Sequence, residues 1–314
     1  MKNPNSPNAL IFRRFCRNKL AVVGFFVLVG MFIFSFLGPI FSPYGEYALF
    51  FMKDGVEISS EEIQDFNEDG IKILRRSPPS PTHPLGTDSD GRDLLTRLMY
   101  GGRISLIIGF GVVLIQLALG ILLGGLAGFY GGITDGLIMR LVDIFNCIPT
   151  LPMMLIGSSM MIVLQVPQQH RIYYVMLFIG FLGWAGVARL VRGQILSLRE
   201  QEFMVATEVL GLSPFRRIFF HLIPNVLPQL IVFATLAIGN VILLESALSF
   251  LGFGLPFPYA SWGNMVNAVT DPIVMRKFLN IWLPPGICIL LSVMSYNFLG
   301  DGLRDAFDPK RTSK

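Results

Sequence analysis

Long runs without charge divide this sequence. Six stretches contain no Asp, Glu, Lys, Arg or His, and each is close to or above the roughly 17 to 25 residues that a helix needs to cross about 30 Å of hydrocarbon. The pattern therefore predicts an all-α polytopic membrane protein with six transmembrane helices. The stretches are Leu20 to Gly45, Ile104 to Thr134, Ile144 to Gln169, Ile172 to Ala188, Leu222 to Leu244 and Phe278 to Gly300.

A seventh uncharged run, Ser246 to Thr270, has a different composition. It contains Pro256, Pro258 and three glycines, which do not suit a continuous helix. Irregular backbone at membrane depth is stable only against protein or water. We therefore expect an interfacial or re-entrant loop here.

The first run could instead be the apolar core of a signal peptide, because basic residues precede it. Its apolar stretch, Leu20 to Leu37, is longer than the roughly 7 to 15 residues of a cleavable core, and no small-residue cleavage motif follows. We expect a retained first transmembrane helix over residues 20–41.

The overall composition agrees with a membrane protein. Hydrophobic residues make up 53% of the chain and charged residues 15%, whereas a water-soluble domain carries about 25% charged residues. Six crossings leave no room for a large soluble catalytic domain, and neither a zinc-protease nor a serine-hydrolase motif occurs. We therefore do not expect an enzyme. We expect no metal or cofactor bound by this chain.

The basic residues predict the orientation in the membrane. Most of the 25 Lys and Arg residues fall on the side of the N-terminus, and most of the others lie in one loop too long for the positive-inside rule. Both termini should be cytoplasmic: a tail over 1–19, an extracytoplasmic loop region over 42–103, a five-helix core over 104–303 and a tail over 304–314. Nucleic acid is not an expected partner, because no basic cluster is interleaved with exposed aromatic residues.

The outer loop is the one soluble piece of any size. Asp65, Asn67, Asp69 and Gly70 spell the opening of a calcium loop, but Arg76 stands where a closing Glu belongs. We favour an acidic turn between short strands near Val56 to Ile58 and Ile71 to Leu74. A stiff proline-rich connector over residues 77–84 then leads to the second helix.

Small residues and prolines mark two predicted spans. Glycines recur every four residues in the second span, which allows close packing against a helix of this chain or of another subunit. Pro149 and Pro152 should bend or break the third span. The glycines are Gly120, Gly124, Gly128 and Gly132.

The cytoplasmic segment over 192–222 carries the most specific local signals. Apolar residues at helical spacing run to Leu210, Gly211 provides a left-handed stop, and Ser213 with Pro214 reads as the cap and first turn of a second helix ending near Leu222. Two short helices joined at Gly211 cannot enclose a core. Their apolar face should rest on the membrane helices or enter a groove on another protein.

Glu245 is the main charged residue inside a predicted span, between Leu244 and Ser246. A buried charge in a membrane is costly, so such residues usually face the interior of a bundle or a water-filled path. One interpretation makes Glu245 an outer gate of a transport path. The other, which we favour here, makes it a hydrated helix end or the partner of a loop arginine.

The cytoplasmic segment resembles the signature of the inner-membrane permease subunits of ABC importers. That signature has the form E-A-A, three residues, G, nine residues and I-x-L-P. This chain has the same spacing with several departures, including Val205 for the Glu. The matching residues are Val205, Ala206 and Thr207, then Gly211, then His221, Leu222, Ile223 and Pro224.

Four further segments resemble the C-type permease of the oligopeptide and dipeptide branch. The resemblance covers about Leu10 to Lys310 and is interrupted at 46–80, which looks like an insertion. The segments are His83 to Asp88 with Gly91 to Asp93 and Tyr100 to Arg103, Met139 to Ile144, Leu244 to Gly252 with Ser261 to Gly263, and Asn297 to Asp305.

The resemblance implies a peptide-translocating subunit in the cytoplasmic (inner) membrane. The implied partners are a homologous second permease, two cytoplasmic ATP-binding subunits that hold ATP and Mg2+, an extracytoplasmic peptide-binding protein, the peptide and membrane lipid. It assigns contact with the ATPase to the loop containing Glu202, Val205, Ala206, Thr207, Glu208, Gly211, Leu212, Ser213, Pro214 and Pro224. Whether Glu202 or Glu208 replaces the missing signature Glu stays open.

The sequence itself agrees that any ATPase is separate. A P-loop ends in Gly-Lys, and no lysine here follows a glycine. The alternatives are a secondary transporter of a small solute driven by an ion gradient, which would need intramembrane charges and an internal repeat, and a structural membrane anchor, which would leave the Gly211 segment unexplained.

Overall fold

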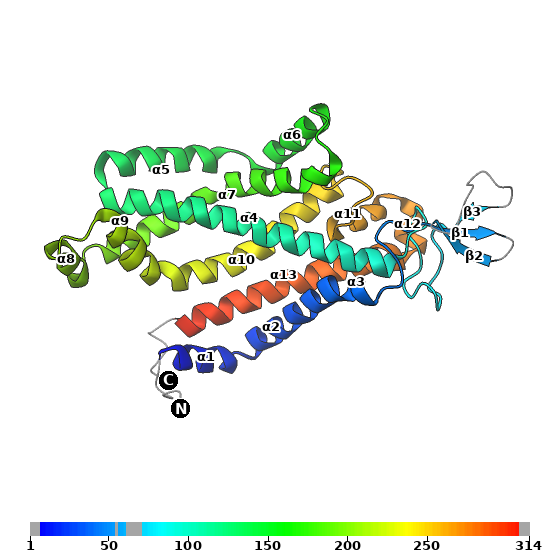
Figure 1. The fold of residues 1–314 in the computed structure, drawn as a ribbon, viewed down its shortest axis with the longest axis horizontal. Helices are drawn as coiled ribbons and strands as arrows, with labels where there is room; N and C mark the ends of the chain where they lie inside the picture. The colour runs from blue at the N-terminus through cyan, green and yellow to red at the C-terminus, as the bar shows by residue number, and fades with distance from the viewer. Residues whose placement is uncertain (1–6, 54–55, 61–70, 308–314) are drawn as a thin grey trace.

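The computed structural model describes the chain except residues 1–6, 54–55, 61–70 and 308–314. It is a helical bundle with a small sheet at one end (Figure 1). The elements are α1 (Pro7–Arg17), α2 (Lys19–Phe32), η1 (Ile33–Leu37), α3 (Gly38–Phe41), β1 (Phe50–Lys53), β2 (Val56–Ser59), β3 (Lys72–Ile73), α4 (Leu94–Tyr130), α5 (Gly132–Cys147), α6 (Thr150–Val163), α7 (Gln168–Leu198), α8 (Glu202–Val209), α9 (Pro214–Arg216), η2 (Arg217–Leu222), α10 (Ile223–Phe250), α11 (Trp262–Val266), η3 (Asn267–Thr270), α12 (Pro272–Lys277) and α13 (Leu279–Phe307).

The all-α polytopic membrane fold is confirmed. Among the described residues, five continuous helical stretches of 23 to 37 residues are long and apolar enough to cross a membrane, and the count is six if the bent pair of α5 and α6 is one span. The five are Lys19–Phe41, Leu94–Tyr130, Gln168–Leu198, Pro214–Phe250 and Leu279–Phe307.

The third span is broken, as its prolines predicted. The axes of α5 and α6 differ by 82°. Pro149 is the extended N-cap residue of α6, and Pro152 follows within the first turn, so neither can continue the hydrogen-bonding ladder of α5. The start that the uncharged run predicted, at Ile144, was wrong, because α5 already begins at Gly132.

Other helix ends differ from those expected from charge. The second span begins at Leu94, inside the predicted outer loop, because the Asp93 carboxylate accepts a hydrogen bond from the Thr96 amide at 2.7 Å and caps the helix. Likewise α7 extends to Leu198, inside the predicted cytoplasmic loop over 192–222. In both cases a charged residue ends the uncharged run, but the helix continues past that residue.

The outer loop contains a three-stranded antiparallel sheet in the order β2-β1-β3. The strands predicted near 56–58 and 71–74 are confirmed as β2 and β3. They do not pair with each other, because β1, which the sequence pattern did not predict, lies between them. The calcium-like residues 65–70 and the acidic turn proposed for them lie outside the described residues.

The glycine repeat packs α4 against α7 within this chain. A Cβ atom at Gly120, Gly124 or Gly128 would lie 2.4 to 2.9 Å from atoms of α7. These contacts confirm packing inside the chain for three of the four glycines. Gly132 is different: it begins α5, and a Cβ atom there would meet nothing within 4 Å.

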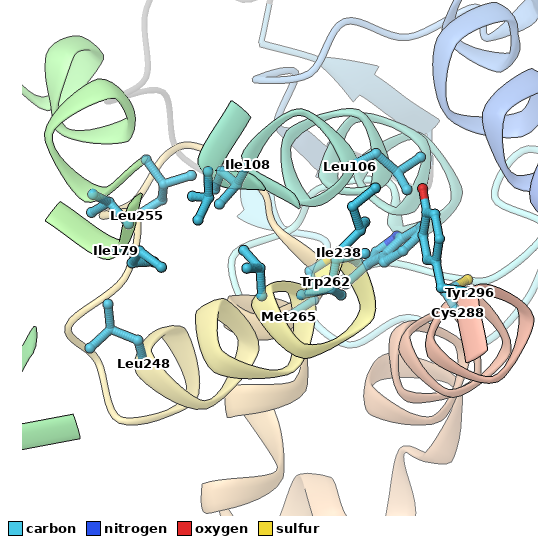
Figure 2. Close-up of a cluster of buried hydrophobic side chains, with 14 of the residues drawn as sticks. Leu106, Ile108, Ile179, Ile238, Leu248, Leu255, Trp262, Met265, Cys288 and Tyr296 are labelled. Carbon is cyan, nitrogen blue, oxygen red and sulfur yellow. The ribbon is translucent and has the colours of Figure 1, made fainter. Parts of the chain in front are cut away.

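The short helix α11 closes the end of the bundle nearer the sheet (Figure 1). Trp262 is fully buried among Leu106 of α4, Ile238 of α10 and Tyr296 of α13 (Figure 2). Its indole N–H donates to the carbonyl oxygen of Leu98 at 3.0 Å. The run expected as a loop over 246–270 therefore includes the last turn of α10 and a segment folded back onto the bundle.

Candidate functional site

The elbow, residues 202–214, has the backbone that its sequence predicts. Gly211 has φ +65°, which favours glycine. The Gly211 amide donates to the Glu208 carbonyl at 2.9 Å and the Leu212 amide to the Thr207 carbonyl at 3.1 Å, the two bonds of a Schellman stop. Ser213 and Pro214 then form the cap and first residue of α9.

One face of α8 is anchored in the protein. Met204 is 1% exposed and packs with Ile195 of α7 and Leu222 of η2. Thr207 also points inward, and its hydroxyl donates to the Met204 carbonyl at 2.7 Å. This buried face fixes the position of the elbow relative to the membrane helices.

The opposite face of the elbow is apolar and exposed. Val205, Val209 and Leu210 are 58%, 83% and 75% exposed. Phe215, just after the elbow, is also exposed. An exposed apolar surface on a short helix that lies outside the candidate membrane spans is typical of a protein contact. The sequence left two outcomes open for the apolar face: packing on the membrane helices or entry into a partner's groove. The buried face of α8 packs on the membrane helices, and its exposed face is free for a partner.

The elbow brings together most of the residues predicted for it. The side chains or backbone at Glu202, Ala206, Gly211, Ser213 and Pro214 are exposed beside Val205, Leu212 is half-buried, and Thr207 is turned inward. The Glu208 carboxylate accepts a hydrogen bond from Arg217 at 3.1 Å, whereas Glu202 lies in the first turn of α8. Of the two acidic residues, Glu208 already has a partner in this chain.

The prediction of a separate second short helix was wrong. Residues from Pro214 form one continuous stretch through η2 into α10. Pro224 lies inside the start of α10, not in the elbow, and it has no amide hydrogen to donate. A wider π-helical turn, η2, directly precedes it, and such turns occur mostly as single-turn bulges within longer helices.

Two arginines that the sequence did not single out join the elbow to α4. Arg199 donates to the carbonyls of Gly128 and Phe129 at 3.3 Å, at the C-terminal end of α4. Arg217 lies over the Phe129 ring, 5.2 Å from its centroid. Their only sequence signal was the density of arginine in this region, which we interpreted as a sign of orientation alone.

Glu245 is buried, so the interpretation that we favoured from the sequence, a hydrated helix end, was wrong. Its residue is 1% exposed, and its two oxygens accept hydrogen bonds from the hydroxyls of Ser249 at 2.6 Å and Ser105 at 3.3 Å. The reason is that α11 folds over the end of α10. The Trp262 amide donates to the Ser105 hydroxyl at 3.3 Å, which ties α11 to the same network.

This serine and carboxylate network holds α4, α10 and α11 together at the end of the bundle nearer the sheet. Its residues can accept and donate hydrogen bonds, but they do not form a nucleophile with its base. Within the described part of the chain, no group of three His, Cys, Asp or Glu side chains is arranged to hold a metal ion. The geometry therefore suits a structural joint better than a reaction centre.

Comparison with known proteins gives the family. Residues 120–313 match the family described as the inner membrane component of binding-protein-dependent transport systems, and residues 6–59 match the N-terminal transmembrane domain of oligopeptide transport permease C.

Relatives align over nearly the whole chain. The dipeptide transport system permease protein DppC of Bacillus subtilis is 36% identical over 95% of this chain and 84% of its own length. The oligopeptide permease OppC of Haemophilus influenzae is 36% identical over 95% and 87%. A putative peptide permease of Brucella suis is 36% identical over 97% and 91%. The chain therefore belongs to the family of inner membrane components of binding-protein-dependent transport systems.

Proposed function

We propose that this chain is the C-type permease subunit of an ATP-driven importer that moves peptides across the cytoplasmic membrane. The observation that carries the proposal is the elbow: a short helix anchored on one face by Met204 and exposing Val205, Val209 and Leu210 on the other. Relatives named as dipeptide and oligopeptide permeases, aligned over nearly the whole chain, support peptide as the substrate.

The partners follow from this assignment. Two cytoplasmic subunits would bind ATP with Mg2+ and receive the exposed face of α8, because this chain has no P-loop lysine of its own. A homologous second permease would complete the path, and an extracytoplasmic peptide-binding protein would deliver the peptide. The family's dependence on a binding protein supports this last partner.

The orientation is part of the proposal. In Figure 1, α1, α8 and the end of α13 lie at one end of the molecule, and the sheet lies at the other. If α8 contacts a cytoplasmic ATPase, both termini are cytoplasmic and the sheet faces outward. The distribution of arginine and lysine supports the same orientation.

The experiment that tests the function separates the two energy sources. The four-subunit complex would be reconstituted in liposomes with its binding protein, and uptake of labelled alanyl-alanine or tri-alanine measured with ATP or with an imposed ion gradient. We expect uptake with ATP alone. Uptake by this chain without the ATPases, driven by the gradient, would support a secondary transporter instead.

A further inference from the structure

Two ion pairs join α5 to α7 near the cytoplasmic end. Both nitrogens of the Arg192 guanidinium fork, Nε and one terminal nitrogen, contact the Asp135 carboxylate, which is the bidentate geometry that fixes two side chains most firmly. Arg189 contacts Asp143 at 2.8 Å. The two pairs connect residues 57 and 46 positions apart.

The two pairs lie beside a small apolar cluster. Val142 of α5 is fully buried and packs with Trp184 and Ala188 of α7. Phe145 of α5 extends this contact, with its ring centroid 5.3 Å from that of Trp184. The inner face of α5 is thus held to α7 along most of its length, from Asp135 to Phe145.

Helix α7 leads directly into the elbow. Only residues 199–201 separate its last residue, Leu198, from the first residue of α8. Arg199 in that link is bonded to the end of α4. A displacement of α8 therefore acts first on the cytoplasmic end of α7. Arg192 and Arg189 lie about one and a half to two turns and about two and a half turns before Leu198.

The attachment of α4 to α7 differs in kind from that of α5. Gly124 brings the backbones of α4 and α7 into close contact, so a relative shift of these two helices would disrupt this packing. Helix α5 instead meets α7 through side chains, and it ends at the 82° bend before α6. A break in the helix, and not a continuous helix, thus joins α5 to α6.

We propose that the Asp135–Arg192 and Asp143–Arg189 ion pairs transmit the movement of the elbow to the broken span, and so link ATP hydrolysis to opening of the transport path. These four are positioning residues, which act through α5 and α6 and not by contact with ATP. The proposal rests on the proposed function, because it takes α8 as the contact with the ATPase.

The test is a charge reversal in the complete complex. Asp135→Arg and Arg192→Asp each replace an attractive pair with a repulsive one, and the double variant restores attraction. We expect each single variant to hydrolyse ATP at near the parental rate but to transport about fivefold or more fewer peptides per ATP. The double variant should return this ratio to within about twofold of the parental value.

Arg140→Asp is the matched control, because Arg140 lies on the same helix and is exposed. It should leave the ratio unchanged. If a reversed variant does not assemble, Asp135→Asn and Arg192→Gln, which remove the charge without repulsion, should each lower the ratio in the same direction.

Three results would overturn the proposal: single variants that keep the parental ratio, an assembled double variant as defective as the singles, or transport and ATP hydrolysis that fall in proportion. Each of these results is compared with the same measurement on the parental complex. Failure of the parental complex to use ATP for uptake of either alanine peptide would instead contradict the proposed function.

Discussion

The carboxylate of Glu245 on α10 accepts a hydrogen bond from the hydroxyl of Ser105 on α4, 140 residues earlier in the chain, at 3.3 Å. Because the Ser105 hydroxyl also accepts the Trp262 amide hydrogen bond, one buried network connects α4, α10 and α11. Opening the outer end of the bundle would break these hydrogen bonds. Glu245 is therefore a candidate gate residue as well as a structural one.

Replacing Glu245 should separate the two roles. Glu245→Ala removes the acceptor of two buried hydroxyls, and each unsatisfied buried group costs about 1 to 3 kcal/mol. Glu245→Gln keeps an acceptor oxygen and nearly the same shape. We expect a clear loss of thermal stability for Ala, measured on the purified complex in detergent, and a smaller loss for Gln.

The gate role has its own measurement, which is the stimulation of ATP hydrolysis by peptide-loaded binding protein. A gate predicts that both Glu245 variants change this stimulation. If stimulation and uptake both stay at the parental values, Glu245 is a structural joint only.

The contact between α4 and α7 predicts a sharp difference between two adjacent glycines. A Cβ atom at Gly124 would lie 2.4 Å from the Ala188 carbonyl oxygen, which is backbone and cannot move aside, whereas one at Gly125 would meet Ile218 at an ordinary 3.6 Å. Gly124→Ala should cost roughly 1 to 3 kcal/mol of stability by overpacking. Gly125→Ala should cost much less. Thermal unfolding of the two variants checks this, and equal melting temperatures would contradict the close packing.

His83 predicts a pH dependence for the outer sheet. Its ring is 1% exposed, with Nδ1 2.8 Å from Asp93, which caps α4, and Nε2 2.6 Å from Glu57 on β2. Burial alone lowers the pKa of His83, but the hydrogen bonds and charges of Asp93 and Glu57 outweigh it and raise this pKa above the ordinary 6.5.

A raised pKa means that protonation of the ring contributes to the stability of the folded chain relative to the unfolded one. This contribution is fully present below about pH 6.5, the unfolded pKa, and is lost as the pH rises through the higher folded pKa. Hydrogen exchange of the β1 and β2 amides, corrected for the intrinsic rate, should therefore show less protection at high pH. His83→Gln should remove the dependence, and a dependence that persists in that variant would assign it to another group.

The proposed orientation can be tested with one cysteine. Val56 lies on β2 and is 63% exposed. In a variant without Cys16, Cys147 and Cys288, Val56→Cys should react with an impermeant maleimide in intact cells. Labelling only after lysis would place the sheet inside the cell and reverse the topology.

The elements that the sequence predicted well are those set by local chemistry. The stop at Gly211, the start at Pro214 and the break at Pro149 each depend on the conformation that one residue type favours. The ends of the uncharged runs at Ile104 and Ala188 did not mark helix ends, because Asp93 capping and interhelical ion pairs allow helices to continue past charged residues.

The parts that sequence could not predict depend on distant segments. Glu245 looked like a helix end, because nothing local indicates that α11, more than ten residues later, covers it. The pairing of Asp135 with Arg192 joins residues 57 positions apart, so no spacing rule reveals it. Strand β1 was missed because its apolar residues, Phe50 and Phe51, do not alternate with polar ones.

The central claim is that the elbow couples this chain to separate ATPase subunits, and Gly211 tests it most directly. A Cβ atom there meets nothing within 4 Å, so Gly211→Val acts on the left-handed backbone alone, at a cost of about 1 to 3 kcal/mol. Gly211→Asn should be milder, because Asn adopts this conformation more readily. Gly30→Val, at an open helical position of α2, is the control.

The measurement is ATP-dependent peptide uptake together with the amount of ATPase subunit that copurifies with the chain. The account predicts normal membrane insertion for all three variants, with uptake and copurified ATPase lowest for Gly211→Val, intermediate for Gly211→Asn and parental for Gly30→Val. Parental uptake by Gly211→Val, with a full complement of bound ATPase, would contradict it.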